Sequence, residues 1–104
     1  MAPRRAQRSP RSTKTITVQV TGRAGVPAGA SAAFFNLAAV YPDGPGFVTL
    51  FPCGTLPGTS NLNFADGGGV RSNNAFTKLT DDGTVCAYTL VGTDLVLDTT
   101  GWVD

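Results

Sequence analysis

The chain has 104 residues, of which 41% are hydrophobic and 14% are charged, a length that fits one domain. It contains no His and no Glu, which excludes a Ser-His-Asp triad, a Cys-His pair and a His-ligated zinc site. Its 13 Gly and 7 Pro disfavour a helical fold. The net charge of +1 conceals an uneven distribution: residues 1–14 hold five bases and no acid, whereas residues 15–104 hold three bases against seven Asp.

The basic N-terminal segment, residues 1–13, carries Pro and Ser and has no apolar pattern. We therefore expect a disordered leader there. Arginines can bind phosphates in a salt-dependent manner, but the rest of the chain lacks basic strands with interleaved aromatics, so no specific nucleic-acid partner is expected. No apolar h-region follows the charges, so the segment does not read as a secretory signal peptide. No apolar run reaches the ~18 residues of a membrane-spanning helix.

Residues 14–104 are expected to form a single domain of short strands. Residues 15–21 alternate polar and apolar side chains, as a strand with one buried face does. Residues 32–41 read as a buried strand, and the Pro- and Gly-rich turn at 42–46 predicts a hairpin with a strand at 47–51. Further strands are predicted at residues 61–64, 73–79, 84–90 and 93–99. The segment Asp81-Asp82-Gly83 predicts a hairpin turn, because Asp-Gly supplies the positive φ that tight hairpins require.

Seven or eight short strands about ten residues apart, with no convincing helix, predict an all-β fold, an antiparallel β-sandwich of immunoglobulin-like size. The expected core is drawn from the apolar positions of these strands: Ile16, Val18, Val20, Phe34, Leu37, Phe47, Leu50, Leu62, Phe76, Val85, Tyr88, Leu95 and Leu97.

The two cysteines, Cys53 and Cys86, are 33 residues apart. Without His they cannot make a standard zinc site, and they do not form a C-x-x-C redox motif. A disulfide that closes a long loop fits them best, and it would imply an oxidising compartment. The alternative is a pair of buried free thiols that behave as small apolar residues.

Several segments together resemble a known module: residues 46–54 (GFVTLFPCG), 60–64 (SNLNF), 83–89 (GTVCAYT) and 93–98 (TDLVLD), followed by Gly101-Trp102. They are similar to a β-rich repeat module of secreted actinobacterial cell-wall-associated proteins, where units stand in tandem, often beside hydrolase domains. The resemblance covers about residues 15–103. It implies an extracellular or cell-wall location, an accessory role, a disulfide between Cys53 and Cys86, and no catalytic residues. The single unit and the Arg-rich leader depart from the family pattern and suggest a piece of a longer secreted protein.

Side-chain amides are numerous for so small a domain, at positions 36, 61, 63, 73 and 74. Amides suit sugar hydroxyls because they both donate and accept hydrogen bonds, and aromatic rings stack on sugar faces. The candidate binding residues are Asn61, Asn63, Asn74, Tyr88 and Trp102, with Tyr41 as a further aromatic platform. The alternative is that the amides satisfy backbone groups at bends and strand ends.

Catalysis would have to rely on carboxylates. Asp94 and Asp98 lie four residues apart on one predicted strand, so both point to the same face, with Cα atoms about 13 Å apart. Glycosidases need carboxyl groups ~5–9.5 Å apart, so Asp98 would pair better with an acid from elsewhere, such as Asp66.

The sequence therefore predicts a non-catalytic binding or accessory module without metal or cofactor, with polysaccharide or a cell-wall polymer as its partner. The alternative from a different functional class is an enzyme, a minimal glycoside hydrolase that uses Asp98, Asp94 or Asp66. A third possibility is a spacer unit that forms homo-oligomers through exposed edge strands.

Overall fold

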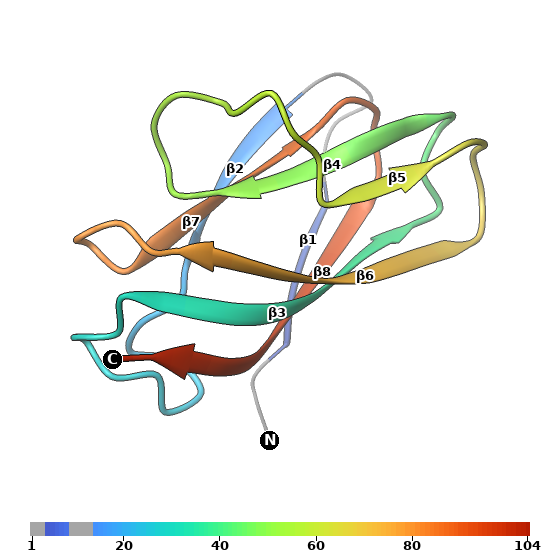
Figure 1. Cartoon of the computed structure of the whole chain (residues 1–104). Coiled ribbons are helices and arrows are strands. Elements are labelled where there is room, and N and C mark those ends of the chain that lie inside the picture. The colour runs from blue at the N-terminus through green and yellow to red at the C-terminus, as the bar shows by residue number, and fades with distance from the viewer. Residues whose placement is uncertain (1–3, 9–13) are drawn as a thin grey trace.

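The protein folds into antiparallel strands without helix in the part of the chain that the computed structural model describes, residues 4–8 and 14–104. Of residues 4–8 and Lys14 it describes the backbone alone. The strands follow one another in the order seen in Figure 1: β1 (Arg4–Arg8), β2 (Lys14–Gln19), β3 (Ala32–Val40), β4 (Gly46–Phe51), β5 (Leu62–Phe64), β6 (Val70–Lys78), β7 (Thr84–Thr89) and β8 (Asp94–Val103).

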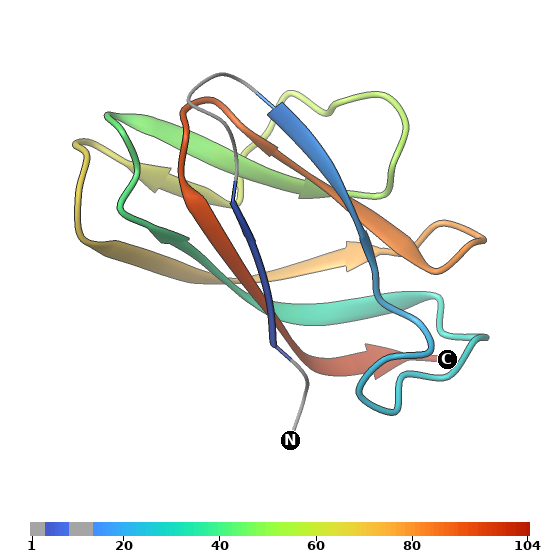
Figure 2. The same ribbon diagram turned by 180° about the vertical axis from the view of Figure 1, so that it is seen from behind.

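The strands form two four-stranded sheets. Sheet A has the order β1-β8-β3-β6, and sheet B has the order β2-β7-β4-β5. All pairings are antiparallel, and the two sheets lie face to face (Figures 1 and 2). The predicted all-β sandwich is confirmed. Among the described residues, no helix is present that has the length and apolar character needed to cross a membrane.

Successive strands mostly change sheet, which corrects the predicted hairpins. β3 belongs to sheet A and β4 to sheet B, so the turn at residues 42–46 carries the chain from one layer to the other. β6 and β7, on either side of Asp81-Asp82-Gly83, likewise belong to different sheets. The predicted tight turn itself is present, closed by hydrogen bonds from Gly83 N to the Thr80 carbonyl at 2.8 Å and from Thr80 N to the Thr84 carbonyl at 3.1 Å. Gly83 does adopt the expected positive φ, 76°. Local turn chemistry thus identified where the chain reverses, but the strand that pairs is chosen by burial of the apolar faces.

The core lies between the sheets and contains most of the predicted residues, with four exceptions. Phe34 and Phe76 are 46% and 51% exposed on the outer face of sheet A. Phe47 and Tyr88 are half-buried on the outer side of sheet B. Adjacent residues of a strand point to opposite faces, so burial of Phe35 and Leu37 turns Phe34 outward.

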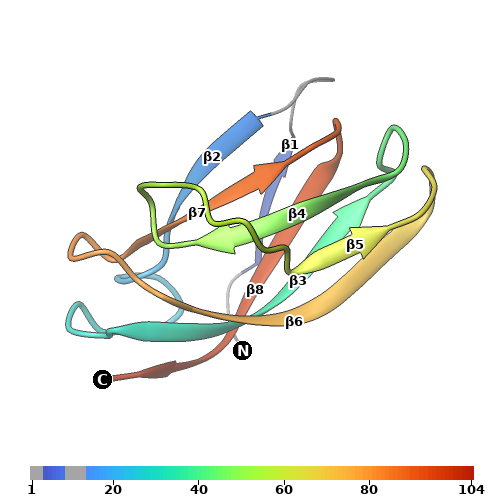
Figure 3. The ribbon, with the colours of Figure 1, turned by 45° about the horizontal axis from the view of Figure 1, so that its top comes forward.

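A disulfide joins Cys53 to Cys86, with a Cα–Cα distance of 4.9 Å, and confirms the pairing expected from the sequence. It attaches the start of the long connection between β4 and β5 to β7. The Thr49 hydroxyl donates to the carbonyl of Thr59 at 2.7 Å and holds the end of the same connection. This segment, residues 52–61, extends over the outer side of sheet B (Figure 3).

Residues 4–8 differ from the expected disordered leader. They form β1, which pairs with β8 in the register Arg4↔Asp98 to Arg8↔Asp94 (Figure 2). Without β1, the strand β8 would end sheet A with a row of unpaired backbone groups, and pairing with β1 removes that edge. The rest of the expected leader, residues 1–3 and 9–13, lies outside the described residues.

Candidate functional site

Two phenylalanines form an exposed aromatic pair on the outer face of sheet A. Phe34 of β3 and Phe76 of β6 are direct register partners, and their ring centroids lie 4.6 Å apart with a tilt of 41°. Rings on neighbouring strands at this distance stabilise each other. About half of each side chain nevertheless stays in solvent. Large apolar side chains exposed side by side are a feature of binding surfaces.

A row of polar side chains lies directly beside the aromatic pair. Asn36 is the register partner of Asn74 on one side and of Asp98 on the other. Antiparallel register partners point to the same face, so two amides and a carboxylate cross sheet A in one line. A shallow depression of about 480 Å³ lies at the aromatic pair and reaches the polar row at Asn74; it is lined by Phe34, Phe35, Asn74, Ala75, Phe76 and Thr100.

An irregularity in β8 shapes the aromatic end of this face. The register between β3 and β8 shifts between Phe34 and Phe35, which leaves Phe34 opposite Gly101. A Cβ added to Gly101 would lie 3.6 Å from the Phe34 ring, an ordinary van der Waals distance, so the ring lies close to β8 at this position. Trp102 follows on the same strand and is 43% exposed, but its register partner is the buried Ala33.

Of the two predicted amides in the SNLNF segment, Asn61 bonds the backbone of β4 and Asn63 bonds a neighbouring side chain. Asn61 Oδ1 accepts a hydrogen bond from Leu50 N at 2.7 Å, where β5 has not yet begun to pair with β4. Asn73 Nδ2 donates to the Asn61 carbonyl at 2.9 Å and links β6 to this segment. Asn63 Oδ1 accepts from the Ser60 hydroxyl at 2.9 Å. The contacts of Asn61 and Asn73 match the alternative in which amides satisfy backbone groups at bends and strand ends, whereas the Asn63 contact is to a side-chain hydroxyl.

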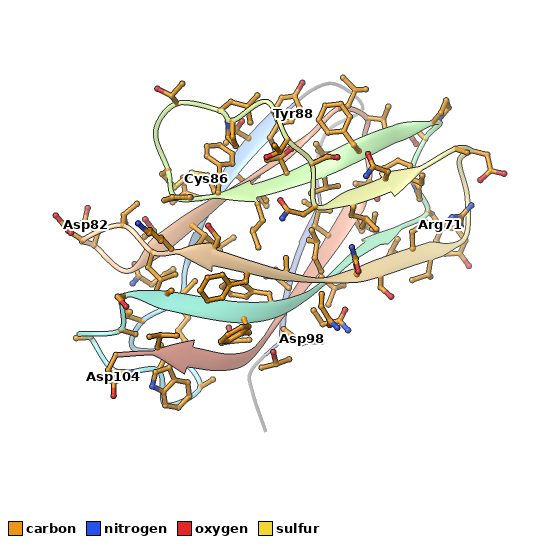
Figure 4. The ribbon with its side chains drawn as sticks, viewed as in Figure 1. Arg71, Asp82, Cys86, Tyr88, Asp98 and Asp104 are labelled. Atoms are coloured by element: carbon orange, nitrogen blue, oxygen red, sulfur yellow. A yellow bond between two sulfur atoms is a disulfide. The ribbon has the colours of Figure 1, made fainter. Side chains whose placement is uncertain are left out.

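Tyr88 lies on the other layer from Asp98 and Arg71, as Figure 4 shows. Its ring packs against Phe47 with centroids 5.8 Å apart. A depression of about 240 Å³ is lined by these rings and by residues 56–60 of the segment over sheet B. The five predicted binding residues are therefore not brought together. Asn74 lies on the outer face of sheet A, Trp102 is in register with the inward-facing Ala33 near the end of β8, and Asn61, Asn63 and Tyr88 lie on the side of sheet B.

The candidate carboxylates are distributed over strand and loop. Asp94 and Asp98 belong to β8 and are the register partners of Val40 and Asn36, so they lie along one strand at the separation expected from the sequence. Asp66 lies between β5 and β6, where it forms an ion pair with Arg71. The described residues hold no group of three or more His, Cys, Asp or Glu able to bind a metal ion.

The outer face of sheet A thus has the best-developed combination of exposed rings and polar groups. Comparisons with family models, with curated proteins and with solved structures find no significant match to this chain. Sequence reasoning singled out Asn74 and Asp98 on this face and counted Asn36 among the amides, whereas the predicted Trp102 is in register with the inward-facing Ala33. It placed Phe34 and Phe76 in the core, because the pattern Phe34-Phe35 does not indicate which ring points inward.

Proposed function

We propose that the protein is a non-catalytic accessory module that binds carbohydrate through the outer face of sheet A. The observation that carries the proposal is the exposed Phe34–Phe76 pair beside the Asn36–Asn74 row. Sugar rings offer apolar C–H faces to aromatic side chains and hydroxyl groups to amides. A sheet face with both kinds of group in adjacent rows matches both surfaces of a sugar.

The chemistry of this face favours binding over hydrolysis. Asp98 is the carboxylate in the polar row, and the next acid on the same strand, Asp94, is about 13 Å away by strand rise, beyond the ~9.5 Å that glycosidases use. An accessory role also agrees with the resemblance to repeat modules of secreted cell-wall-associated proteins. In that setting the cell-wall polymer is the partner, and the disulfide suits an oxidising, extracellular location.

Retention on insoluble polysaccharide tests the proposal. The protein is mixed with chitin, cellulose or purified peptidoglycan, and the bound fraction is measured after centrifugation. We expect retention on at least one of these polymers and a loss of about tenfold in affinity for the double variant Phe34→Ala/Phe76→Ala, a change equal to ~1.4 kcal/mol. Both rings are half-exposed, so the variant keeps the core intact.

A matched control lies on the opposite layer. Leu56 is 43% exposed in the segment over sheet B, so Leu56→Ala removes a comparable apolar surface without touching sheet A. It should bind like the unaltered protein. Absence of retention on all three polymers would contradict carbohydrate binding, and equal losses in both variants would contradict the assignment to sheet A.

A further inference from the structure

The strand β6 ends sheet A and presents a long backbone edge beside the aromatic pair. We infer that this free edge of β6 is an interface for a second copy of the chain, and that the side chain of Asn73 holds the interface closed. The inference concerns an edge of the sandwich, and it goes beyond the carbohydrate binding proposed for the outer face of sheet A.

Alternate residues of β6 direct their backbone groups away from β3. Tyr41 N donates to the Gly69 carbonyl at 2.6 Å, just beyond one end of the ladder between β3 and β6. Leu79 N donates to the Ser31 carbonyl at 2.9 Å, just beyond its other end. Both hydrogen bonds continue the register, so the odd-numbered residues of β6 bond to β3. The even-numbered residues therefore direct their N–H and C=O groups to the free edge: Val70, Ser72, Asn74, Phe76 and Lys78.

An edge of this kind can pair with another chain. No described strand pairs with it, since β3 is the one neighbour of β6 in sheet A. β6 is nine residues long and contains neither proline nor glycine, and a long regular edge is a template for pairing between molecules. Two antiparallel β6 strands overlap along their whole length when the twofold axis passes through Asn74, the middle residue of the strand.

This register suits both the backbone and the charges of β6. Even-numbered residues face even-numbered residues of the second copy, so the backbone groups at the two free edges meet. Arg71 faces Thr77 of the second copy, and Lys78 faces Val70 of the second copy. The two cationic residues of the strand therefore never lie opposite each other, which avoids a destabilising pair of like charges.

The side chain of Asn73 occupies the middle of this edge. Its Oδ1 accepts a hydrogen bond from Asn74 N at 3.0 Å, the edge donor that lies at the axis of the pairing described above. Its Nδ2 donates to the Asn61 carbonyl at 2.9 Å, beside β5, which ends sheet B. One amide thus satisfies the central edge donor and joins the edges of the two sheets. A second β6 strand has to displace this side chain in each copy before it can pair with Asn74.

Removal of the Asn73 side chain tests the inference. Sedimentation equilibrium gives the dimer dissociation constants of the full-length protein and of its Asn73→Ala and Ser72→Ala variants. We expect Asn73→Ala to dimerise at least about tenfold more tightly than the unaltered protein. Ser72→Ala is the matched control, because Ser72 is an exposed neighbour on the same strand, and it should behave like the unaltered protein. Adding Asn74→Pro to Asn73→Ala should restore the monomer, since proline removes an edge N–H that β3 does not use.

Hydrogen exchange shows which surface associates, even if the proline variant does not fold. In the Asn73→Ala dimer, the even-numbered amides of β6 should be at least about tenfold better protected than in its dilute monomer, whereas the odd-numbered amides are protected in both. Equal dissociation constants of Asn73→Ala and Ser72→Ala would overturn the inference, and so would a dimer whose even-numbered amides stay unprotected. An unaltered protein that already dimerises with these amides protected would overturn the role of Asn73. No saccharide enters these measurements, so their failure leaves the proposed function standing.

Discussion

Asn61 shows how a single amide side chain can take the place of a strand. β5 pairs with β4 only as far as Val48↔Leu62, so the next backbone donor on that edge of β4, Leu50 N, has no partner strand. Asn61 Oδ1 accepts this hydrogen bond at 2.7 Å, beside a leucine that is 4% exposed. The side chain therefore satisfies a backbone donor that packing largely shields from water.

We expect Asn61→Ala to lower the free energy of unfolding by ~1–3 kcal/mol, the cost of leaving a buried donor without a partner. Asn61→Asp keeps the acceptor oxygen and should retain most of the stability. The matched control is Asn63→Ala, since Asn63 is exposed and accepts only from the Ser60 hydroxyl among the contacts described above. Urea denaturation measures all three. Equal stabilities of the two alanine variants would refute the backbone role of Asn61.

Gly83 combines two constraints at one residue. Its φ is 76°, and an added Cβ would lie 1.8 Å from Thr21 Oγ1 and 2.7 Å from Thr21 Cβ. We expect Gly83→Ala to destabilise the fold by ~2–3 kcal/mol, because both backbone strain and a steric clash oppose it. Gly29→Ala is the control, since a Cβ there meets nothing within 4 Å, and it should change stability by less than ~0.5 kcal/mol. A similar midpoint for both variants in thermal unfolding would contradict this account.

For single residues, the sequence did not indicate which of two consecutive apolar side chains points into the core. Phe34 and Phe35 are equally apolar, and only the packing of β3 against sheet B decides that Phe35 is buried and Phe34 exposed. The candidate site depends on this choice, since Phe34 becomes half of its aromatic pair. Asn74 was singled out because amides suit sugar hydroxyls, and Asp98 because catalysis would have to rely on carboxylates. Asn74 and Asp98 lie on either side of Asn36 because of the register in which β3 pairs with β6 and β8, and the sequence does not specify that register.

Among the elements, strand positions were predicted better than strand partners. Residues 32–41 and 47–51 are strands as expected, but they belong to different sheets. The turn residues between them set the local reversal, and the same residues permit a hairpin or a crossing between layers. The choice depends on which arrangement buries both apolar faces, a property of all the strands together.

The connection between β4 and β5 owes its position to the disulfide. Cys53 and Cys86 are 33 positions apart in the sequence, and their bond attaches residues 52–61 to β7. Replacing both cysteines by serine should lower the free energy of unfolding by ~2–4 kcal/mol. Reductant should lower the unfolding midpoint of the unaltered protein to about that of the double variant, and it should leave the midpoint of the double variant unchanged. A protein whose midpoint does not respond to reductant would contradict a stabilising disulfide.

At the scale of the whole molecule, the two outer faces of the sandwich are used differently. The face of sheet B is partly covered by residues 52–61, which bury Thr49 to 1% exposure and leave a small depression beside Phe47 and Tyr88. Within residues 14–104, no segment covers β3 and β6 on the outer face of sheet A in this way, and their outward residues are exposed or half-buried. A ligand therefore has an open surface on sheet A, and this asymmetry supports the binding face proposed above.

Sheet A also depends on the N-terminal strand, which leads to a last prediction. β1 pairs with residues 94–98 of β8, and alternate amides of an antiparallel strand point to each neighbour. Deleting residues 1–8 should therefore expose every second amide of residues 94–98 to exchange, while the amides directed at β3 stay protected. We expect at least about a tenfold loss of protection, equal to ~1.4 kcal/mol of opening free energy.

Native-state hydrogen exchange followed by NMR measures this effect residue by residue. Deletion of residues 1–3 is the matched control, because it shortens the chain and keeps β1 (Arg4–Arg8) intact. The strand β7 serves as an internal reference, since it lies in sheet B between β2 and β4 and does not contact β1 in the ladder. Unchanged protection of β8 would contradict the pairing. A uniform loss that includes β7 would instead show that β1 is needed for the stability of both sheets, not of one edge alone.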